Sequence, residues 1–390
     1  MIIKPKFRGF ICTTSHPEGC KKNVENQINY VESNEKIKGI KNVLVLGAST
    51  GYGLASSIVS AVACDANVLA VSFEREGTEK RTASSGWYNI EALKSLLAEK
   101  KSQVLSINGD AFSLEIKEEA IEKIKEYMGK VDLVIYSLAA PKRTNPLTKE
   151  TLSSCLKTIG EPFSNKTVNF HTGEISNITI PAATEEEIKG TVGVMGGEDW
   201  MLWIKALKEA KVLSEGVKTI AYSYIGPEVT YPIYREGTIG KAKEHLEKTA
   251  KEITEYLKNI KGQGIISVNK ALVTQASSAI PIVPLYVAIL YKLMIERGTH
   301  EGCIEQIYRL FNGVYGNKNL VKDSEERLKL DDYEMDEELQ NEIVHIWEKI
   351  NTDNINDLSY INLIREEFFK LFGFGVDEVD YNKDINPRIV

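Results

Sequence analysis

The stretch Val43–Gly53 reads VLVLGASTGYG, an apolar run that leads directly into a glycine-rich turn. Apolar residues then recur at helical spacing, beginning with Leu54 and Ile58. Glycines in such a turn let the chain bend sharply, so that backbone N–H groups at the start of a helix can face a pyrophosphate. The stretch therefore predicts a dinucleotide-binding strand, turn and helix. We expect ligand contacts along the whole turn: Gly47, Ala48, Ser49, Thr50, Gly51, Tyr52 and Gly53.

The same rhythm of buried strand and amphipathic helix continues along the chain. Further strand-like runs are Val68–Phe73, Val104–Ile107, Val131–Ser137, Thr219–Ile225 and Ile265–Val268. Apolar strands that alternate with helices predict an α/β fold, a Rossmann-type doubly wound parallel sheet covered on both faces. A chain of 390 residues could hold two or three domains. The continuous pattern favours a single domain over residues 1–390.

Three segments fall outside that rhythm. Residues 1–40 form an N-terminal extension, and residues 300–390 form a helical, acidic C-terminal extension whose outer face should be solvated. Residues 141–216 separate the fourth strand from the fifth by more than twice the usual spacing of roughly 30 residues. Within them, Lys166–Ile180 predicts a β-hairpin, and a helix follows near Trp200. Because this insertion follows a strand at the carboxyl edge of the sheet, we expect an enlarged substrate-binding lid.

Composition excludes several classes of partner. With 48 Lys plus Arg against 55 Asp plus Glu, the net charge is −7, so nucleic acid is not expected. The longest apolar stretch, Ala279–Tyr291, is too short to cross a bilayer, so no membrane insertion is expected. Five scattered cysteines are typical of a reduced, cytoplasmic protein. Cys12, His16 and Cys20 recur every four residues but lack a fourth ligand, so no metal site is predicted.

Other strand ends supply the rest of a dinucleotide track. Glu74 ends the second strand, 21 residues beyond Gly53, where a carboxylate binds the ribose 2′-hydroxyl and repels a 2′-phosphate. NADH is therefore favoured over NADPH, although the adjacent Arg75 leaves NADPH open. The Gly-x-x-x-Gly-x-Gly spacing is that of short-chain dehydrogenases/reductases. Further contacts are expected after the third and fourth strands, at Asp110, Ala111, Leu138 and Ala139.

The catalytic pair of that fold needs a Tyr and a nearby Lys. None of the 17 tyrosines has a Lys four residues on, but Tyr234, after the fifth strand, precedes both Lys241 and Lys243. A helix over Ile239–Ile260 buries one apolar stripe, and at 100° per residue Lys243 lies about 60° from its centre. Lys241 lies about 140° away, on the solvent face. Lys243 is therefore the candidate partner of Tyr234.

These motifs together resemble a specific family. The Tyr-x8-Lys spacing of YREGTIGKAK (Tyr234–Lys243), with YSYIGPE and GGEDW before it, is similar to the trans-2-enoyl-CoA reductases and V-type enoyl-ACP reductases. The segments GASTGYG, FERE, GWYN, NGDAF, YSLAAP and SVNKALVTQASSAIP resemble the same family in the same order. The resemblance covers nearly the whole chain, from about Phe7 to the DYNKD near its end.

The resemblance implies an NADH-dependent oxidoreductase of fatty acid metabolism. It would saturate the C2–C3 double bond of a trans-2-enoyl thioester carried by CoA or by acyl carrier protein. Tyr234 would be the proton donor and Tyr224 a substrate contact, with Lys243 holding the cofactor. Further cofactor contacts implied are Phe73, Leu272, Val273 and Thr274. The family's members are usually monomeric and cytosolic.

Two other functions are also compatible with the sequence. A short-chain carbonyl reductase would need a catalytic Ser, and Tyr222-Ser223-Tyr224 offers one only on the strand itself. A non-catalytic, dinucleotide-sensing module would need the glycine turn but neither a Tyr–Lys pair nor a lid. The carrier, CoA or acyl carrier protein, and the chain length of the acyl group also stay open.

Overall fold

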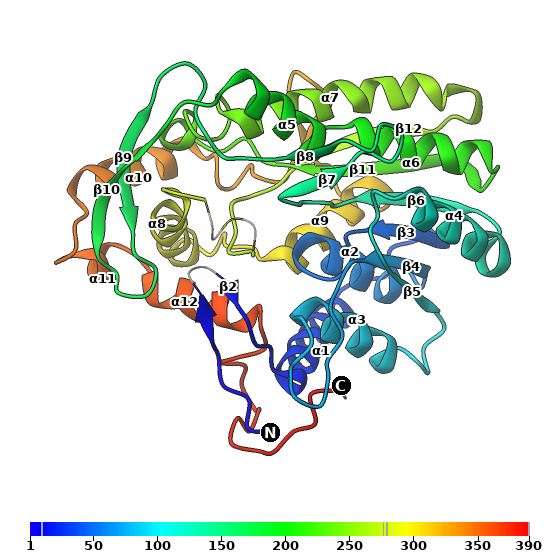
Figure 1. Cartoon of the computed structure of the whole chain (residues 1–390), viewed down its shortest axis with the longest axis horizontal. Helices are drawn as coiled ribbons and strands as arrows, with labels where there is room; N and C mark the ends of the chain where they lie inside the picture. The colour runs from blue at the N-terminus through cyan, green and yellow to red at the C-terminus, as the bar shows by residue number, and fades with distance from the viewer. Residues whose placement is uncertain (9–10, 276, 278–279, 389–390) are drawn as a thin grey trace.

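The centre of the protein is one eight-stranded sheet, seen in a computed structural model that describes residues 1–8, 11–275, 277 and 280–388 (Figure 1). The strand order is β13-β14-β12-β11-β6-β3-β4-β5. Their bounds are β3 Asn42–Leu46, β4 Asn67–Ser72, β5 Val104–Asn108, β6 Val131–Tyr136, β11 Leu213–Ser223, β12 Gln263–Val268, β13 Val321–Lys322 and β14 Leu328–Lys329. All neighbours pair in parallel except β13 with β14. The predicted doubly wound α/β fold is confirmed.

Helices cover both faces because successive strand residues point to opposite sides. In β3, Val43 and Val45 join one buried cluster, whereas Leu44 and Leu46 join the other. The helices on the Val45 side are α1 Pro17–Glu32, α2 Gly51–Val62, α3 Ser85–Leu96 and α9 Cys303–Tyr315. Those on the Leu44 side are α4 Leu114–Lys123, continued by η1 Ile124–Met128, α6 Glu198–Glu209, and α7 Thr238–Tyr256 with η3 Lys258–Ile260.

The predicted insertion, residues 141–216, has two structural parts. Its first part holds β7 Lys142–Thr144, β8 Thr151–Ser153, β9 Phe163–Val168, β10 Ile175–Ile180 and α5 Glu185–Met195. The predicted hairpin is confirmed as β9 and β10, which pair antiparallel, and β9 contacts α8 Val283–Glu296. The second part, α6, differs from the expected lid helix, because Trp200 and Trp203 bury it against the sheet. In Figure 1 the hairpin stands at the end of the molecule away from the sheet.

The N-terminal extension packs against the core. After β1 Phe7–Arg8 and β2 Ile11–Cys12, His16 caps α1, its Nδ1 accepting a hydrogen bond from the Gly19 amide at 3.1 Å. Cys12 Sγ donates to the Thr14 carbonyl at 3.1 Å. Cys20 is fully buried, and burial raises its pKa well above the usual range of a thiol. The four-residue spacing of these side chains therefore reflects a helix start.

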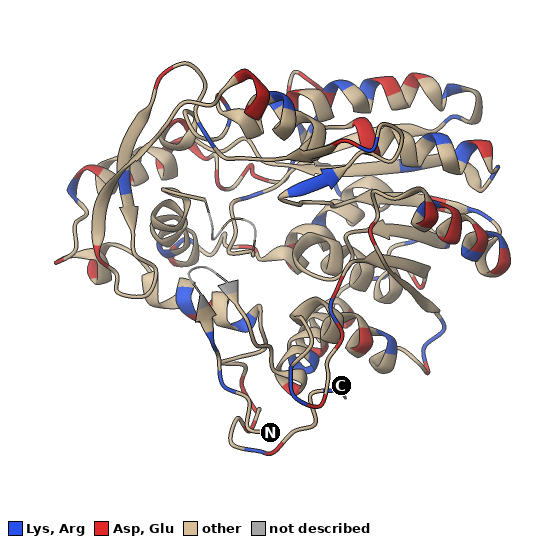
Figure 2. Ribbon diagram, viewed as in Figure 1, with Lys and Arg blue, Asp and Glu red and all other residues tan. Residues whose placement is uncertain are grey.

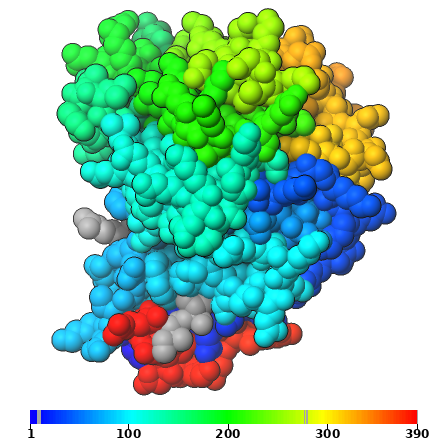
Figure 3. Space-filling model, turned by 90° about the vertical axis from the view of Figure 1, so that its right-hand side faces the viewer, coloured from blue at the N-terminus to red at the C-terminus, as the bar shows by residue number. Residues whose placement is uncertain are grey.

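The C-terminal extension wraps around α8 and returns to the N-terminal half. Of the predicted extension, residues 300–390, α9 instead packs on the sheet, and the later helices are α10 Glu337–Lys349, α11 Ile355–Leu358 and α12 Ile361–Lys370. Figure 3 shows the C-terminal segment, in red, at the foot of the molecule. Near the end of the chain, the Pro387 carbonyl accepts a hydrogen bond from the Tyr88 hydroxyl at 2.5 Å. Acidic and basic residues are interspersed on outer helices such as α4 and α7 (Figure 2). No helix within the described residues is both long enough and apolar enough to span a bilayer.

Candidate active site

The glycine turn is shaped by close backbone contacts. Gly47 has φ +83°, and a Cβ there would lie 2.1 Å from the Ser137 carbonyl oxygen. A Cβ on Gly53 would lie 1.9 Å from the Gly47 carbonyl oxygen. Thr50 precedes α2, but its side chain accepts no hydrogen bond from the first turn of that helix. The N–H groups at the start of α2 are therefore available to a diphosphate, and the turn fits the predicted dinucleotide.

Glu74 is held at the end of β4 by its neighbours. Its Oε1 accepts a hydrogen bond from Ser49 Oγ at 2.6 Å, and its backbone N–H donates to Asn108 Oδ1 at 2.7 Å. A Cβ on Gly86 would lie 2.1 Å from Oε1, so the glycine of the GWYN motif leaves room for the carboxylate. Glu74 thus lies beside the turn, as its position in the sequence predicts. Phe73, one residue earlier, exposes 77% of its surface.

The next two strands bring the remaining predicted contacts to the same edge. Asp110 and Ala111 follow β5, and Asp110 Oδ1 accepts the Phe112 amide at 2.9 Å. Ala111 is buried, and its carbonyl accepts Lys117 Nζ at 2.8 Å. Leu138 and the exposed Ala139 follow β6. Leu138 Cδ2 would lie 3.2 Å from a Cβ on Gly47, so this loop and the glycine turn are in contact.

The segment after β12 closes over the turn. Tyr52, in α2, donates a hydrogen bond from its hydroxyl to the Lys270 carbonyl at 2.9 Å. Thr274 Cγ2 would lie 4.0 Å from a Cβ on Gly51. Thr274 therefore lies next to the glycine turn, and the other two predicted contacts, Leu272 and Val273, precede it in the same segment. Ala276, Ser278 and Ala279, which belong to the same motif, lie outside the described residues.

Two tyrosines meet just after the end of β11. Tyr224 follows β11, and Tyr234 lies between η2 Glu228–Thr230 and α7. Their rings pack edge to face with centroids 4.7 Å apart. Both side chains are half-buried. Burial raises the pKa of each phenol, and the Glu334 carboxylate raises that of Tyr224 further. Both phenols therefore keep their protons at neutral pH.

The two candidate lysines lie on different faces of α7. Lys243 is half-buried, and its Nζ donates a hydrogen bond to the Tyr222 carbonyl at 3.0 Å, at the end of β11. Burial lowers its pKa to about 8, against the opposing charge of Glu247. Lys241 is exposed and its Nζ pairs with Glu244 Oε2 at 2.9 Å. The orientation predicted from helical phase is confirmed.

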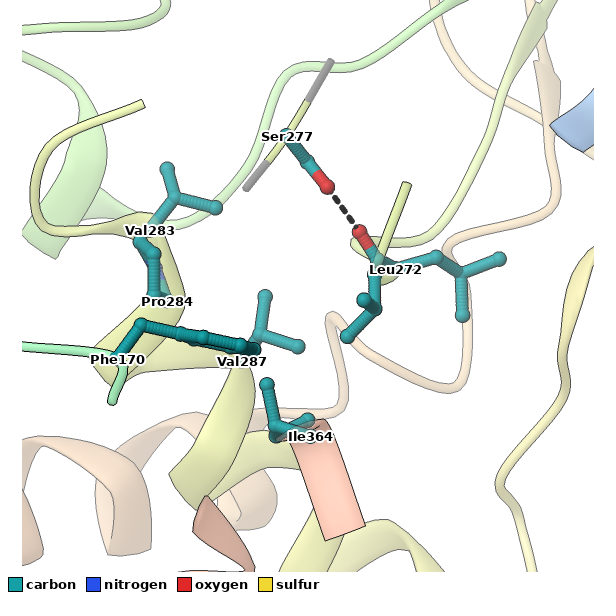
Figure 4. A pocket seen from close by; sticks show the side chains of 8 residues that line it. Phe170, Leu272, Ser277, Val283, Pro284, Val287 and Ile364 are labelled. Atoms are coloured by element: carbon teal, nitrogen blue, oxygen red, sulfur yellow. Dashed lines mark hydrogen bonds between the residues drawn. The ribbon is translucent and has the colours of Figure 1, made fainter. Parts of the chain in front are cut away.

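A small apolar pocket opens next to the segment that follows β12 (Figure 4). Its walls come from the hairpin turn, the start of α8, α12 and that segment. The lining residues are Phe170, Leu272, Val273, Ser277, Val283, Pro284, Val287 and Ile364. Ser277 Oγ donates its proton to the Leu272 carbonyl at 2.5 Å, so this hydrogen bond lies within the wall of the pocket. The hairpin predicted as a lid therefore contributes, through Phe170, to an apolar wall.

Sequence reasoning missed one charged residue of this region. Glu334 is fully buried between β14 and α10, and its Oε1 accepts the Tyr224 hydroxyl at 3.0 Å. It stands in the acidic run Asp331–Glu338, which predicts a solvated surface. The only local signal is the buried pair Leu328 and Leu330, whose alternation marks a short strand before it.

Comparison with known proteins decides the family. A profile described as the trans-2-enoyl-CoA reductase catalytic region matches residues 81–315, and one for the NAD(P)H binding domain of trans-2-enoyl-CoA reductase matches residues 2–79. The chain belongs to the trans-2-enoyl-CoA reductase family. Among its relatives is a protein of Clostridium perfringens (strain 13 / Type A) named trans-2-enoyl-CoA reductase [NADH], 68% identical over 100% of both chains. An enoyl-[acyl-carrier-protein] reductase [NADH] of Cytophaga hutchinsonii is 53% identical over 100% of this chain and 98% of its own.

Solved structures of the family have the same fold. The Clostridium acetobutulicum trans-2-enoyl-CoA reductase in complex with NADH superimposes with a TM-score of 0.96 at 43% identity, covering 99% of this chain and 98% of that one. The Treponema denticola trans-2-enoyl-CoA reductase in complex with NAD gives 0.95 at 44% identity, covering 100% of this chain and 99% of that one.

A third profile, described as an enoyl reductase FAD binding domain, matches residues 322–385. All of these residues are described, and their helices pack apolar side chains into the core around α8. The two glycines of the segment, Gly373 and Gly375, follow α12 and do not lie between a strand and a helix. The segment contains no turn like Val43–Gly53 that could hold a diphosphate. These residues do not fit a flavin, and no chemical step is assigned to one.

Proposed function

We propose that this protein reduces the C2–C3 double bond of trans-2-enoyl thioesters with NADH, using Tyr234 as the proton donor and Lys243 as its charged neighbour. The observation that carries the proposal is the Tyr224–Tyr234 ring pair just after β11, together with the hydrogen bond from Lys243 Nζ to the Tyr222 carbonyl at the end of the same strand. Family membership and the names of the relatives support the same reaction.

The arrangement suits the charge changes of this reaction. When bound, NADH supplies a hydride to C3, and negative charge develops on the thioester oxygen. The Tyr234 hydroxyl can hydrogen-bond that oxygen and supply the proton that must end on C2 to complete the saturated thioester, because a phenol with a raised pKa stays protonated until an enolate forms. The Lys243 ammonium eases loss of the phenol proton and would hydrogen-bond the nicotinamide ribose. Tyr224 would contact the thioester from the other side.

The remaining residues bind rather than react. The seven residues of the glycine turn would hold the diphosphate, and Glu74 the adenosine ribose. Phe73, Asp110 and Ala111 would flank the adenine end. The nicotinamide end would be enclosed by Leu138, Ala139, Leu272, Val273 and Thr274. Five strand ends meeting at one edge of the sheet support this path for the cofactor.

The proposed acyl site borders this apolar pocket, which has room for little more than one water molecule and would have to widen to admit a chain. It adjoins Leu272 and Val273, which would border the nicotinamide, and it offers alkyl and aromatic surface. The carrier can be CoA or acyl carrier protein, because relatives of both names match the full chain.

Steady-state oxidation of NADH tests the function directly. We expect turnover with crotonyl-CoA, a longer enoyl-CoA or an enoyl-acyl carrier protein, with a saturated thioester as the product by mass spectrometry. Turnover of a ketone but no enoyl thioester would select the carbonyl reductase instead. NADH binding without turnover of any of these substrates would select the sensing module.

We also propose that the protein acts as a monomer in the cytoplasm. Its five cysteines are all free, and three are buried, which suits a reducing compartment. Light scattering after size-exclusion chromatography tests the first point, with a mass near 43.6 kDa expected and a doubled mass contradicting it.

A further inference from the structure

Glu334 is a carboxylate in the interior, and the reaction above does not use it. Three donors converge on its two oxygens. Oε1 accepts the hydroxyls of Tyr224 at 3.0 Å and Tyr286 at 2.7 Å, and Oε2 accepts the Ala271 backbone N–H at 2.7 Å. An ionised carboxylate only accepts hydrogen bonds, so the donor set matches that form.

Two of the three donors belong to the active site. Tyr224 packs against Tyr234, and Ala271 begins the segment that continues as Leu272–Thr274. One carboxylate therefore connects the proposed substrate side to the proposed cofactor side. The third donor, Tyr286, is a buried residue of α8 and links Glu334 to the core.

The surroundings hold this carboxylate in place. Gln340, in α10, donates from Nε2 to the Glu334 backbone carbonyl at 2.6 Å and to the Tyr286 hydroxyl at 3.2 Å. Lys270 is buried nearby, and its Nζ donates to the Ala271 carbonyl at 3.0 Å. Burial raises the pKa of Glu334, and the positive charge of Lys270 opposes that rise.

The Tyr224 hydroxyl has only one proton, and the structure directs it to Glu334. That proton is unavailable to the substrate while the hydrogen bond persists. Within the described part of the chain, no hydrogen bond joins the Tyr234 hydroxyl to a carboxylate, and burial raises its pKa. The two phenols are thus chemically different although their rings touch.

We propose that Glu334 is a positioning residue of the enoyl reduction: it fixes Tyr224 against Tyr234, engages the Tyr224 proton, and holds the start of the cofactor-covering segment at Ala271. This inference rests on the proposed function. It gives the C-terminal segment, residues 322–385, a role in substrate positioning instead of flavin binding.

A double-mutant cycle with saturating NADH tests the link through Tyr224. Glu334→Gln keeps the shape of the side chain but removes its charge and one acceptor. We expect it to raise KM for crotonyl-CoA about tenfold, with a smaller change in kcat, because a hydrogen bond to a charged group is lost. Tyr224→Phe should have a similar effect, and the double variant should be no worse than the poorer single variant.

Tyr286→Phe is the matched control, because it removes a hydrogen bond from the same Glu334 oxygen without touching Tyr224. We expect less than about a twofold change in KM for crotonyl-CoA. Melting temperatures of all variants should be measured alongside. The proposal is overturned if Glu334→Gln and Tyr286→Phe have equal kinetic effects, or if the effects of Glu334→Gln and Tyr224→Phe multiply.

If Glu334→Gln does not fold, Glu334→Asp replaces it in the kinetic test. It keeps the charge but withdraws the oxygens by one methylene, so the same rise in KM is expected, and unchanged kinetics would contradict the proposal. Wild-type protein that turns over no enoyl thioester would instead remove the proposed function. Active wild-type protein with silent Glu334 variants would remove only this inference.

Discussion

The cofactor side and the substrate side of this site are built in different ways. The cofactor side is made mainly of backbone, where Gly47 and Gly53 allow contacts that any Cβ would block. The substrate side is made of side chains from distant segments, and the Tyr224–Glu334 hydrogen bond joins residues 110 positions apart. The first kind of site is fixed by local sequence, whereas the second depends on how the whole chain packs. Variants on the two sides should therefore affect different steps.

The largest expected effect is on the substrate side. Tyr234→Phe keeps the ring but removes the hydroxyl, and we expect kcat to fall about 10²–10⁴-fold, roughly 3–5 kcal/mol of transition-state stabilisation. Steady-state NADH oxidation with crotonyl-CoA measures this. Tyr231→Phe, three residues earlier and also half-buried, is the control and should stay near wild type. Equal losses in both variants would mean that the turn, not the hydroxyl, matters.

The next effect lies where the two sides meet. Lys243→Met should lower kcat/KM about 10–10²-fold and also weaken NADH binding, because one ammonium serves both the phenol and the cofactor. Lys241→Met, on the exposed face, should be nearly silent. If Lys241→Met were the damaging change, the working spacing would be Tyr-x6-Lys and the assignment of Lys243 would be wrong.

The charge of Lys243 should make kcat/KM depend on pH. Its pKa is lowered to about 8, so it carries its charge below that pH and loses it as the pH rises through that value. We expect kcat/KM to fall on the alkaline side of about pH 8 in the wild type. Lys243→Arg should move this descent to higher pH, since a guanidinium stays protonated. An identical profile in both proteins would show that another group titrates.

On the cofactor side, Gly53→Ala should act through the backbone. Its Cβ would lie 1.9 Å from the Gly47 carbonyl, so the turn must shift. We expect NADH affinity to fall about tenfold and the free energy of unfolding to fall by more than about 1 kcal/mol. Calorimetric titration and denaturant unfolding measure the two effects. Normal NADH binding would show that the turn does not hold the diphosphate.

The smallest effect is on cofactor choice. Glu74→Ala should raise KM for NADH several-fold and narrow the preference over NADPH, because the carboxylate that binds the ribose and repels a 2′-phosphate is gone. The ratio of kcat/KM for the two cofactors measures it. An unchanged ratio would place the adenosine ribose away from β4.

The same contrast explains what the sequence could predict. Periodic apolar runs located the six central strands, and helical phase placed Lys243 and Lys241 on the correct faces of α7. Both signals are local. The two-residue strands β13 and β14 were not expected, because β13 is too short to show a period and β14 offers only the single Leu328–Leu330 alternation. Glu334 looked like a surface acid because its partners come from β11, α8 and the segment after β12.

The helix α6 shows the opposite limit. Its apolar pattern was recognised, but the helix was assigned to the lid because the fifth strand was expected to begin only at Thr219. In the structure this strand, β11, begins at Leu213, directly after the helix. Trp200 and Trp203 instead cover the sheet. A periodic pattern predicts that a helix is buried, but not which partner buries it.

We expect acid catalysis and cofactor binding to be separable in this site. Calorimetric titration of NADH into Tyr234→Phe tests it most directly, because the same variant should lose most of its turnover. We predict an NADH dissociation constant within about twofold of the wild type. A loss of NADH affinity as large as the loss of kcat would contradict the account, since Tyr234 would then hold the cofactor rather than supply the proton.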